Sequence, residues 1–438
     1  MEKLAALVWG VPTMVLLMAV GLVLTWQTRF VQVRRLGASI RQVGRSIRGA
    51  GRSSFQAVCT ALAGTVGTGN IAGVAGAIAL GGPGAVFWMW VAAFFGMATK
   101  YAEVVLAMRY RRRGQDGTYR GGPMYYIRDG LGRRWRFLAG FFAFFAVLAS
   151  LGMGNMAQVH TVASAAQTAL PGIRPELTAL GTGLGSALLT ALVAWGGARR
   201  IGTVMEKLVP VAAAIYVAGA LAVIAAHRQQ LGPVLASIVQ GAFEPRAVLG
   251  GSAGIGLGKA IRWGVARGVF SNEAGMGSAP MAHASAEASP EEQGLLGIFE
   301  VFLDTVVLCT LTALAILTSG VSIGWGEAAG AELAAAALRT VFGPPGTAML
   351  AVCLALLALA TLMTWQLYGA RCAGYLWGDR GERLYRLAYL AAVLLGATME
   401  LSEVWAFSDL CNGLMCLPNL TALLLLRRQV GKAHCKTG

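Results

Sequence analysis

Two short runs of small and polar residues stand inside long apolar stretches of this sequence, and they are the residues best suited to do chemistry. The first is Gly67-Thr68-Gly69-Asn70, and the second is Ser271-Asn272-Glu273-Ala274-Gly275. Glycine weakens a helix, and backbone groups freed inside a membrane need partners from protein, water or ligand. We therefore predict that a helix breaks at each run and that the unwound backbone lines a cavity.

Two broken helices could bind a small zwitterion together with a cation. The free N–H groups of a half-helix bind a carboxylate, and the carbonyls at a half-helix C-terminus attract a cation. Paired interrupted helices in corresponding positions are a sequence signal of a transporter binding site. The alternative is that Gly69 and Gly73 only allow close helix packing. The amide of Asn70 at bilayer depth favours the binding site over packing alone.

Two carboxylates, Glu273 and Asp304, also lie within apolar stretches. Such residues cost about 2.5–3.5 kcal/mol at the bilayer centre, so they face a cavity or a partner. For Glu273 two interpretations stay open, namely an ion pair with Arg267 and a role at the binding site. For Asp304 we favour a structural hydrogen bond to a Thr or Ser over a role in coupling.

We expect transmembrane helices to carry these residues. The 438 residues are 56% hydrophobic and only 13% charged, so an all-α membrane protein is expected. The formal net charge of +16 is confined to short tracts between apolar stretches, which indicates membrane orientation rather than nucleic-acid binding. Apolar windows of about 20 residues predict about eleven spans. Their expected extents are 5–26, 55–80, 84–109, 136–166, 178–197, 205–226, 250–283, 294–319, 346–376, 384–399 and 404–426.

The basic tracts alternate along the chain and predict an external N-terminus and a cytoplasmic C-terminus. Only the expected cytoplasmic loop 283–294 is acidic instead. The whole chain, 1–438, is expected to be one transport domain. Span 5–26 is extra, and 55–226 and 250–426 form two five-helix repeats, each beginning with a broken helix. Because five is odd, the second repeat is inverted.

Two other classes of membrane protein fit less well. A channel would repeat one pore-lining element around an axis, whereas this chain has one pair of non-identical broken helices. A membrane-embedded enzyme would need a nucleophile–base set or a metal cluster, and the sequence offers neither. We therefore expect a secondary transporter that is not an enzyme.

Several longer motifs make the chain resemble the alanine or glycine:cation symporters of bacteria and archaea. They run from the second span to the last, and the run Phe270 to Pro280 is the most specific. The matching stretches are Gly67 to Val74, Gly121 to Ile127, Gly154 to Gln158, Glu206 to Pro210, Arg267 to Pro280, Phe302 to Thr305 and Asn412 to Met415.

This resemblance implies the inverted-repeat fold of the leucine transporter and uptake by alternating access in a prokaryotic cell membrane. The implied substrate is alanine or glycine, and the implied coupling ion is Na+ or alternatively H+, with no further cofactor. A monomer is the expected state. By position, the residues at the substrate would be Thr68, Gly69, Asn70, Gln158, Ser271, Asn272, Gly275 and Trp365. The residues at Na+ would be Gly64, Val66, Asn70 and Thr361, and Ala360 stands where a Ser is expected.

Overall fold

The computed structural model describes residues 4, 8–49, 51–114, 117–169, 172–244, 256–399 and 402–434. This part of the chain is helical, apart from one antiparallel pair of two-residue strands, β1 (Arg112–Arg113) and β2 (Tyr119–Arg120). The expected all-α membrane architecture is therefore present. Residues 250–255 of the predicted seventh span lie outside the described residues.

Helices follow one another with short connections along the whole chain. Those of the first half are α2 (Val11–Gln27), α3 (Val31–Arg34), α4 (Leu36–Ile47), α5 (Arg52–Thr65), η1 (Gly69–Gly73), α6 (Val74–Gly81), α7 (Gly84–Arg109), α8 (Pro123–Gly130), η2 (Arg133–Trp135), α9 (Arg136–Leu151), η3 (Gly152–Met156), α10 (Ala157–Ala169), α11 (Pro175–Ala194) and α12 (Gly197–Ala226). Those of the second half are η4 (Arg228–Gln230), α13 (Leu231–Phe243), α15 (Leu257–Asn272), α16 (Pro280–His283), α17 (Pro290–Val301), η5 (Phe302–Cys309), α18 (Thr310–Thr318), α19 (Ala331–Phe342), α20 (Pro344–Thr398) and α21 (Ser402–His434).

Length and apolar composition mark seven continuous helices of the described chain as membrane spans. An eighth span is the bent pair of α5 with η1 and α6. The helix α2, with 17 residues, is shorter. The helix α20 joins two helices at Gly378, whose φ of +69° is not helical, so the predicted spans 346–376 and 384–399 appear as one kinked element. The chain is thus a multi-pass membrane protein, although its spans do not match the eleven predicted ones one for one.

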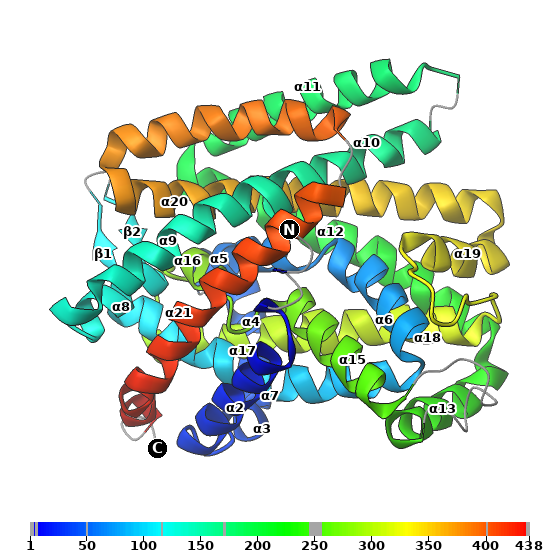
Figure 1. Ribbon diagram of the computed structural model, residues 1–438, viewed down its shortest axis with the longest axis horizontal. Helices are drawn as coiled ribbons and strands as arrows, with labels where there is room; N and C mark the ends of the chain where they lie inside the picture. The colour runs from blue at the N-terminus through cyan, green and yellow to red at the C-terminus, as the bar shows by residue number, and fades with distance from the viewer. Residues whose placement is uncertain are drawn as a thin grey trace.

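The long helices form two groups that pack on each other. In one group α7 contacts α15, α17 and α2, and in the other α20 contacts α9, α10, α11 and α12. Short elements gather at the two ends of the long helices, with α8, β1 and β2 at one end and α13 and α19 at the other (Figure 1).

Burial along the helices follows an inside-out pattern that suits a lipid solvent. The interior holds large aromatic side chains such as Trp365, Tyr368 and Tyr389, all buried. By contrast, α11 exposes a stripe of leucines at helical spacing, which a membrane would cover. These exposed leucines are Leu177, Leu180, Leu184, Leu188 and Leu192.

Candidate functional site

The first predicted break is present between α5 and η1. The helix α5 ends at Thr65, Val66 is extended, and the helical axis bends by 51° before α6 continues. The side chain of Asn70 stabilises the break, because its Oδ1 accepts a hydrogen bond of 2.8 Å from the backbone N of Gly67. The last carbonyls of α5 lose their intrahelical partners at this point.

The amide nitrogen of Asn70 joins this break to two other segments. It donates to Ser271 Oγ at 3.0 Å and to Asp304 Oδ1 at 2.7 Å. Asp304 also accepts from Ser271 Oγ at 2.8 Å and from Thr305 Oγ1 at 2.9 Å. Asn70 is 2% exposed and Asp304 is fully buried. The predicted residues Asn70, Ser271 and Asp304 therefore form one buried network, and Asp304 bonds to both a Ser and a Thr.

The second predicted break follows directly after α15. Asn272 ends the helix, Glu273 takes a left-handed φ of +53°, and the helical α16 begins only at Pro280. Asn272 donates to Thr305 Oγ1 at 3.0 Å and accepts from Ala274 N at 3.0 Å. This ties the end of α15 to η5, the same segment that Asn70 contacts. Both breaks thus meet at η5.

Glycine is required within the second break. Gly275 and Gly277 have φ values of +92° and +82°, a region that side chains disfavour. A Cβ at Gly277 would lie 2.5 Å from Pro123 Cγ, and a Cβ at Gly275 would lie 2.6 Å from Leu17 Cδ2. Gly69 is different, since a Cβ there would lie 3.5 Å from Ser271 Cα, an ordinary contact distance.

Side chains from α7 and α21 hold the unwound backbone of the second break. Glu103 Oε1 accepts from Gly277 N at 3.0 Å and from Asn419 Nδ2 at 2.5 Å. Asn419 Nδ2 also donates to Gly275 O at 2.8 Å. These contacts place Gly275 against α21, and the described hydrogen bonds do not bring it to the Asn70 network. Its place among the substrate residues stays a prediction.

The structure decides between the two interpretations of Glu273 in part. Among the described residues there is no ion pair between Glu273 and Arg267. Instead Glu273 accepts a hydrogen bond from the Ser278 hydroxyl, and the Arg267 guanidinium lies 5.5 Å from the Trp263 ring and 5.7 Å from the Phe270 ring. The ion-pair interpretation was wrong because Glu273 lies beyond the end of α15, where the chain turns away from the helix that carries Arg267.

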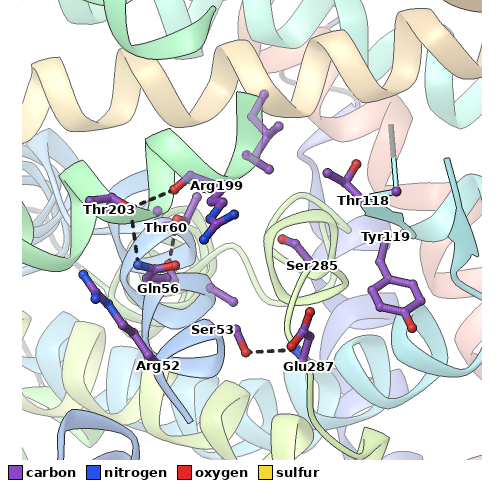
Figure 2. A pocket seen from close by; sticks show the side chains of 15 residues that line it. Arg52, Ser53, Gln56, Thr60, Thr118, Tyr119, Arg199, Thr203, Ser285 and Glu287 are labelled. Atoms are coloured by element: carbon purple, nitrogen blue, oxygen red, sulfur yellow. Dashed lines mark hydrogen bonds between the residues drawn. The ribbon is translucent and has the colours of Figure 1, made fainter. Parts of the chain in front are cut away.

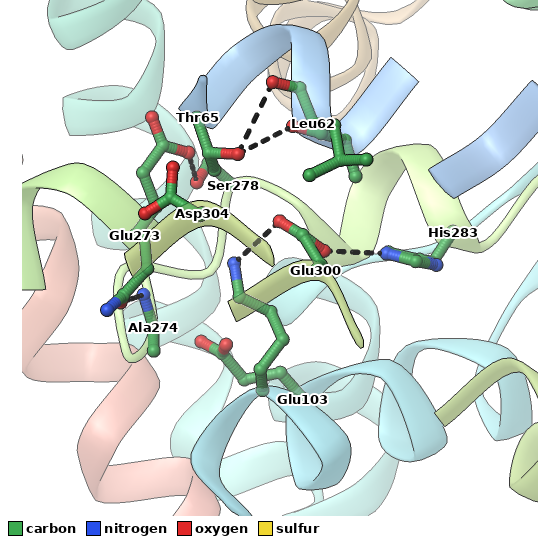
Figure 3. Close-up of polar contacts among 12 residues, drawn as sticks. Leu62, Thr65, Glu103, Glu273, Ala274, Ser278, His283, Glu300 and Asp304 are labelled. Atoms are coloured by element: carbon green, nitrogen blue, oxygen red, sulfur yellow. Dashed lines mark hydrogen bonds and ion pairs between the residues drawn. The ribbon is translucent and has the colours of Figure 1, made fainter. Parts of the chain in front are cut away.

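A buried charge cluster beside the second break was missed by the sequence reasoning. Lys100 Nζ lies 3.2 Å from Glu300 Oε1, and Glu300 Oε2 lies 2.9 Å from His283 Nε2 (Figure 3). Gln293 contacts the other ring nitrogen of His283 at 2.7 Å. All four residues are fully buried. The sequence could have drawn attention to this cluster, because Lys100 and Glu300 are charged residues within predicted spans, just as Glu273 is.

Thr361 lies over the end of the first half-helix. Its Oγ1 donates to Ala63 O at 2.8 Å or to Leu357 O at 3.0 Å, and a Cβ at Gly67 would lie 3.4 Å from it. The carbonyls predicted to bind Na+ together with Thr361 are those of Gly64 and Val66, and this stays a prediction. The carbonyl that Thr361 contacts belongs to Ala63, one residue earlier in the same helical turn.

Gln158 and Trp365 are buried at a different junction. Gln158 Nε2 donates to Met153 O at 3.0 Å, and a Cβ at Gly154 would lie 2.3 Å from Trp365 Cβ. Both therefore pack on the π-helical segment η3. In the described part of the chain, Gln158 Oε1 and Trp365 Nε1 have no hydrogen-bond partner. No described hydrogen bond links either residue to the Asn70 network.

A polar cavity of about 690 Å³ opens beside the N-terminal half of α5 (Figure 2). An ion pair of 2.7 Å between Arg52 and Glu206 lies beside it, and Gln56 donates to Glu206 at 3.0 Å. None of the residues predicted for substrate or Na+ lines this cavity. Its polar lining includes Arg52, Gln56, Thr60, Thr118, Arg199, Thr203, Ser285 and Glu287.

Long apolar helices, two of them broken around a buried polar network, define a multi-pass helical membrane protein of the transporter type. Comparison with known proteins gives the family. The model of the sodium:alanine symporter family matches residues 1–436, so the chain belongs to that family, whose members are symporters rather than enzymes.

Named relatives cover nearly the whole chain. The chain is 42% identical to the sodium/alanine symporter AgcS of Methanococcus maripaludis, over 96% of this chain and 92% of the relative. It is 43% identical to an uncharacterized transporter of Haemophilus influenzae, over 98% and 94% of the two chains. It is 39% identical to the probable sodium/glutamine symporter GlnT of Bacillus subtilis, over 97% and 87%.

Proposed function

We propose that this symporter imports a small neutral amino acid, alanine or glycine, together with Na+ by alternating access. The observation that carries the proposal is the Asn70 amide. It stabilises the first break and reaches Ser271 of α15 and Asp304 of η5, all at buried positions. One polar side chain thus forms hydrogen bonds with the segments of both breaks. A ligand bound there would favour one relative arrangement of the two repeats over another.

The size of the substrate follows from the close approach of the two breaks. A Cβ at Gly69 would already be in contact with Ser271, so this side of the site leaves little room for a large side chain. We propose that Thr68 and Asn272 line the same side of the substrate site as Gly69 and Ser271. Trp365 Nε1 and Gln158 Oε1 have no hydrogen-bond partner among the described residues. We propose that the first is the donor for the substrate carboxylate and the second an acceptor for its ammonium group.

The cation is proposed to bind at the C-terminal end of α5. The carbonyl-rich end of a half-helix is negative, and hard cations prefer oxygen ligands. Thr361 lies at this end of α5. Gly64 and Val66, whose carbonyls are proposed as further ligands, flank the last residue of α5. Asn70 Oδ1 and the Asp304 carboxylate add oxygens on the substrate side. Ala360 brings no hydroxyl, which leaves Thr361 as the side-chain ligand from α20.

The proposed topology has eleven spans. The first span is the extra helix, and the other ten form the repeats 55–226 and 250–426, which have opposite orientations in the membrane. The polar cavity beside α5 would then be the cytoplasmic vestibule, since basic loops surround it. Single cysteines at Arg113 and Gln229, both exposed, test this in a cysteine-free background. We expect only the one at Gln229 to react with an impermeant reagent added outside cells. Equal reaction of both would contradict the topology.

Uptake by reconstituted vesicles tests the proposal. Labelled alanine should accumulate when a Na+ gradient is imposed alone, and a proton gradient alone should give little uptake. Unlabelled glycine should compete with it. Glutamine, after which the Bacillus subtilis relative GlnT is described, should compete poorly because of its larger side chain. Accumulation driven only by the proton gradient would replace Na+ by H+ as the coupling ion, and no accumulation with either would refute the proposal.

A further inference from the structure

The chain turns at the end of α2 in a way that marks the level of the membrane surface. Trp26 and Phe30 are 76% and 43% exposed, with ring centroids 6.4 Å apart. Exposed aromatic side chains at the end of an apolar helix are typical of the membrane–water interface. Arg29 and Phe30 both have left-handed φ values, which end the helix, and Thr28 Oγ1 bonds back to Leu24 O at 2.7 Å. The next helices, α3 and α4, therefore begin at this interface.

One side of α4 is fastened to the protein. Ser39 Oγ donates to Leu295 O of α17 at 2.6 Å, and Val43 and Ser46 are buried. The helix packs on α17 and α5 and is drawn beside α17 in Figure 1. This anchorage fixes which side chains of α4 point away from the protein.

The outward side of α4 has an apolar edge and a basic edge. Ile40 and Ile47 are 48% and 60% exposed and lie seven residues apart, nearly two helical turns. Arg41, Arg45 and Arg48 are exposed on the adjacent edge, and they make no hydrogen bond or ion pair with residues that the structure describes. The helix therefore offers two apolar side chains and three unpaired guanidinium groups to its surroundings.

We propose that this side of α4 binds anionic phospholipid headgroups of the leaflet at whose surface α2 ends. An amphipathic basic helix at the interface buries its apolar edge among the acyl chains and holds its cations among the headgroups. Guanidinium groups bind phosphate with two parallel hydrogen bonds, and each arginine near an anionic surface strengthens binding by about fivefold. The helix then braces α17, which leads into η5 and Asp304. This inference does not depend on the substrate or the coupling ion.

Photo-crosslinking to the full-length protein in vesicles tests the inference. Phosphatidylcholine vesicles would carry a trace of photoreactive phosphatidylglycerol or, in a matched sample, photoreactive phosphatidylcholine, and cross-linked peptides would be mapped. In wild type we expect phosphatidylglycerol to label residues 33–48 at least about fivefold more than phosphatidylcholine, the factor for one arginine. The variant Arg41→Gln/Arg45→Gln/Arg48→Gln should lose this preference. The matched control Arg133→Gln/Arg134→Gln/Arg136→Gln, at three other exposed arginines, should keep it.

A second variant separates the apolar edge from the basic one. Ile40→Ser/Ile47→Ser should lower labelling of α4 by both lipids, since it removes the side chains that reach the acyl region. Equal labelling of α4 by the two lipids in wild type, or an unchanged preference in the triple arginine variant, would overturn the proposal. No labelling of α4 by either lipid would also overturn it and would show that this side faces water or protein. Alanine uptake by the same vesicles reports separately on the transport proposal.

Discussion

The freed backbone groups of the two broken helices are stabilised by different kinds of contact. At the first break a single neutral side chain, Asn70, stabilises the bend and reaches across to α15 and η5. At the second break the backbone itself is unusual, with left-handed conformations at Glu273, Gly275 and Gly277. There Glu103 and Asn419, which belong to other helices, bind the freed N–H and C=O groups.

This difference indicates that the two segments respond differently to a bound ligand. The first break is held by one side chain whose partners lie on other segments, so a ligand that competes for those partners can change it. The second break contains Glu273 in a left-handed conformation, which is strained for a residue other than glycine, and its backbone is held by a carboxylate that accepts two hydrogen bonds. Strained backbone persists only where its surroundings determine it. We infer that the first break responds to ligand and that the second is the more rigid frame.

Substitution of Asn70 should have the largest effect on transport. Asn70→Asp would place a second carboxylate against Asp304 and repel the substrate carboxylate, while it still attracts Na+. Asn70→Ala would leave the Gly67 N–H and Asp304 Oδ1 without these partners, at about 1–3 kcal/mol each, or roughly 5- to 150-fold in an equilibrium. Both variants should lose alanine uptake, and the Asp variant should retain more Na+-dependent thermal stabilisation than the Ala variant. Normal uptake and Na+ dependence in both would reduce Asn70 to a packing residue.

Glu273→Gln should reduce uptake strongly without preventing membrane insertion. The change removes the ionisable carboxyl group where the second break begins and puts an amide in place of the group that accepts from Ser278. Uptake in vesicles and the amount of protein extracted from membranes are the two measurements. Ser278→Ala is the matched control, since it removes the hydrogen bond from Ser278 but keeps the ionisable carboxyl group, and its effect should be smaller. Wild-type kinetics in Glu273→Gln would show that the charge is dispensable.

A glycine-to-alanine substitution should lower the stability of the protein more at the second break than at the first. Gly277→Ala forces a side chain into a left-handed conformation and against Pro123, so the free energy of unfolding should fall by about 1–3 kcal/mol. Gly69→Ala meets only an ordinary contact with Ser271 and should change thermal stability little. It should instead narrow the site and favour glycine over alanine in competition assays. Equal losses of stability in the two variants would contradict the rigid-frame interpretation.

The sequence allowed both breaks to be predicted, because glycine clusters and an amide inside apolar stretches are unusual whatever the tertiary structure. It also brought Asn70, Ser271 and Asp304 to attention. It did not predict Glu103 and Asn419, because their role depends on which distant helices pack against the second break. Lys100 and Glu300 could have been flagged as charges within predicted spans. The contact of Gly275 with Asn419 was not predicted, because neighbours in sequence diverge once the helix unwinds.

We propose that the two breaks form one Na+-dependent amino-acid site, and alanine binding to purified protein tests this claim. Affinity for labelled alanine would be measured against Na+ concentration for wild type, Asn70→Ala, Ser271→Ala and the double variant. Because Asn70 Nδ2 and Ser271 Oγ are 3.0 Å apart, the two effects should be coupled by about 0.5 kcal/mol or more. We expect the double variant to bind more tightly than the product of the single effects predicts, with affinity rising with Na+ in wild type. Independent effects, or wild-type affinity that does not change with Na+, would contradict the claim.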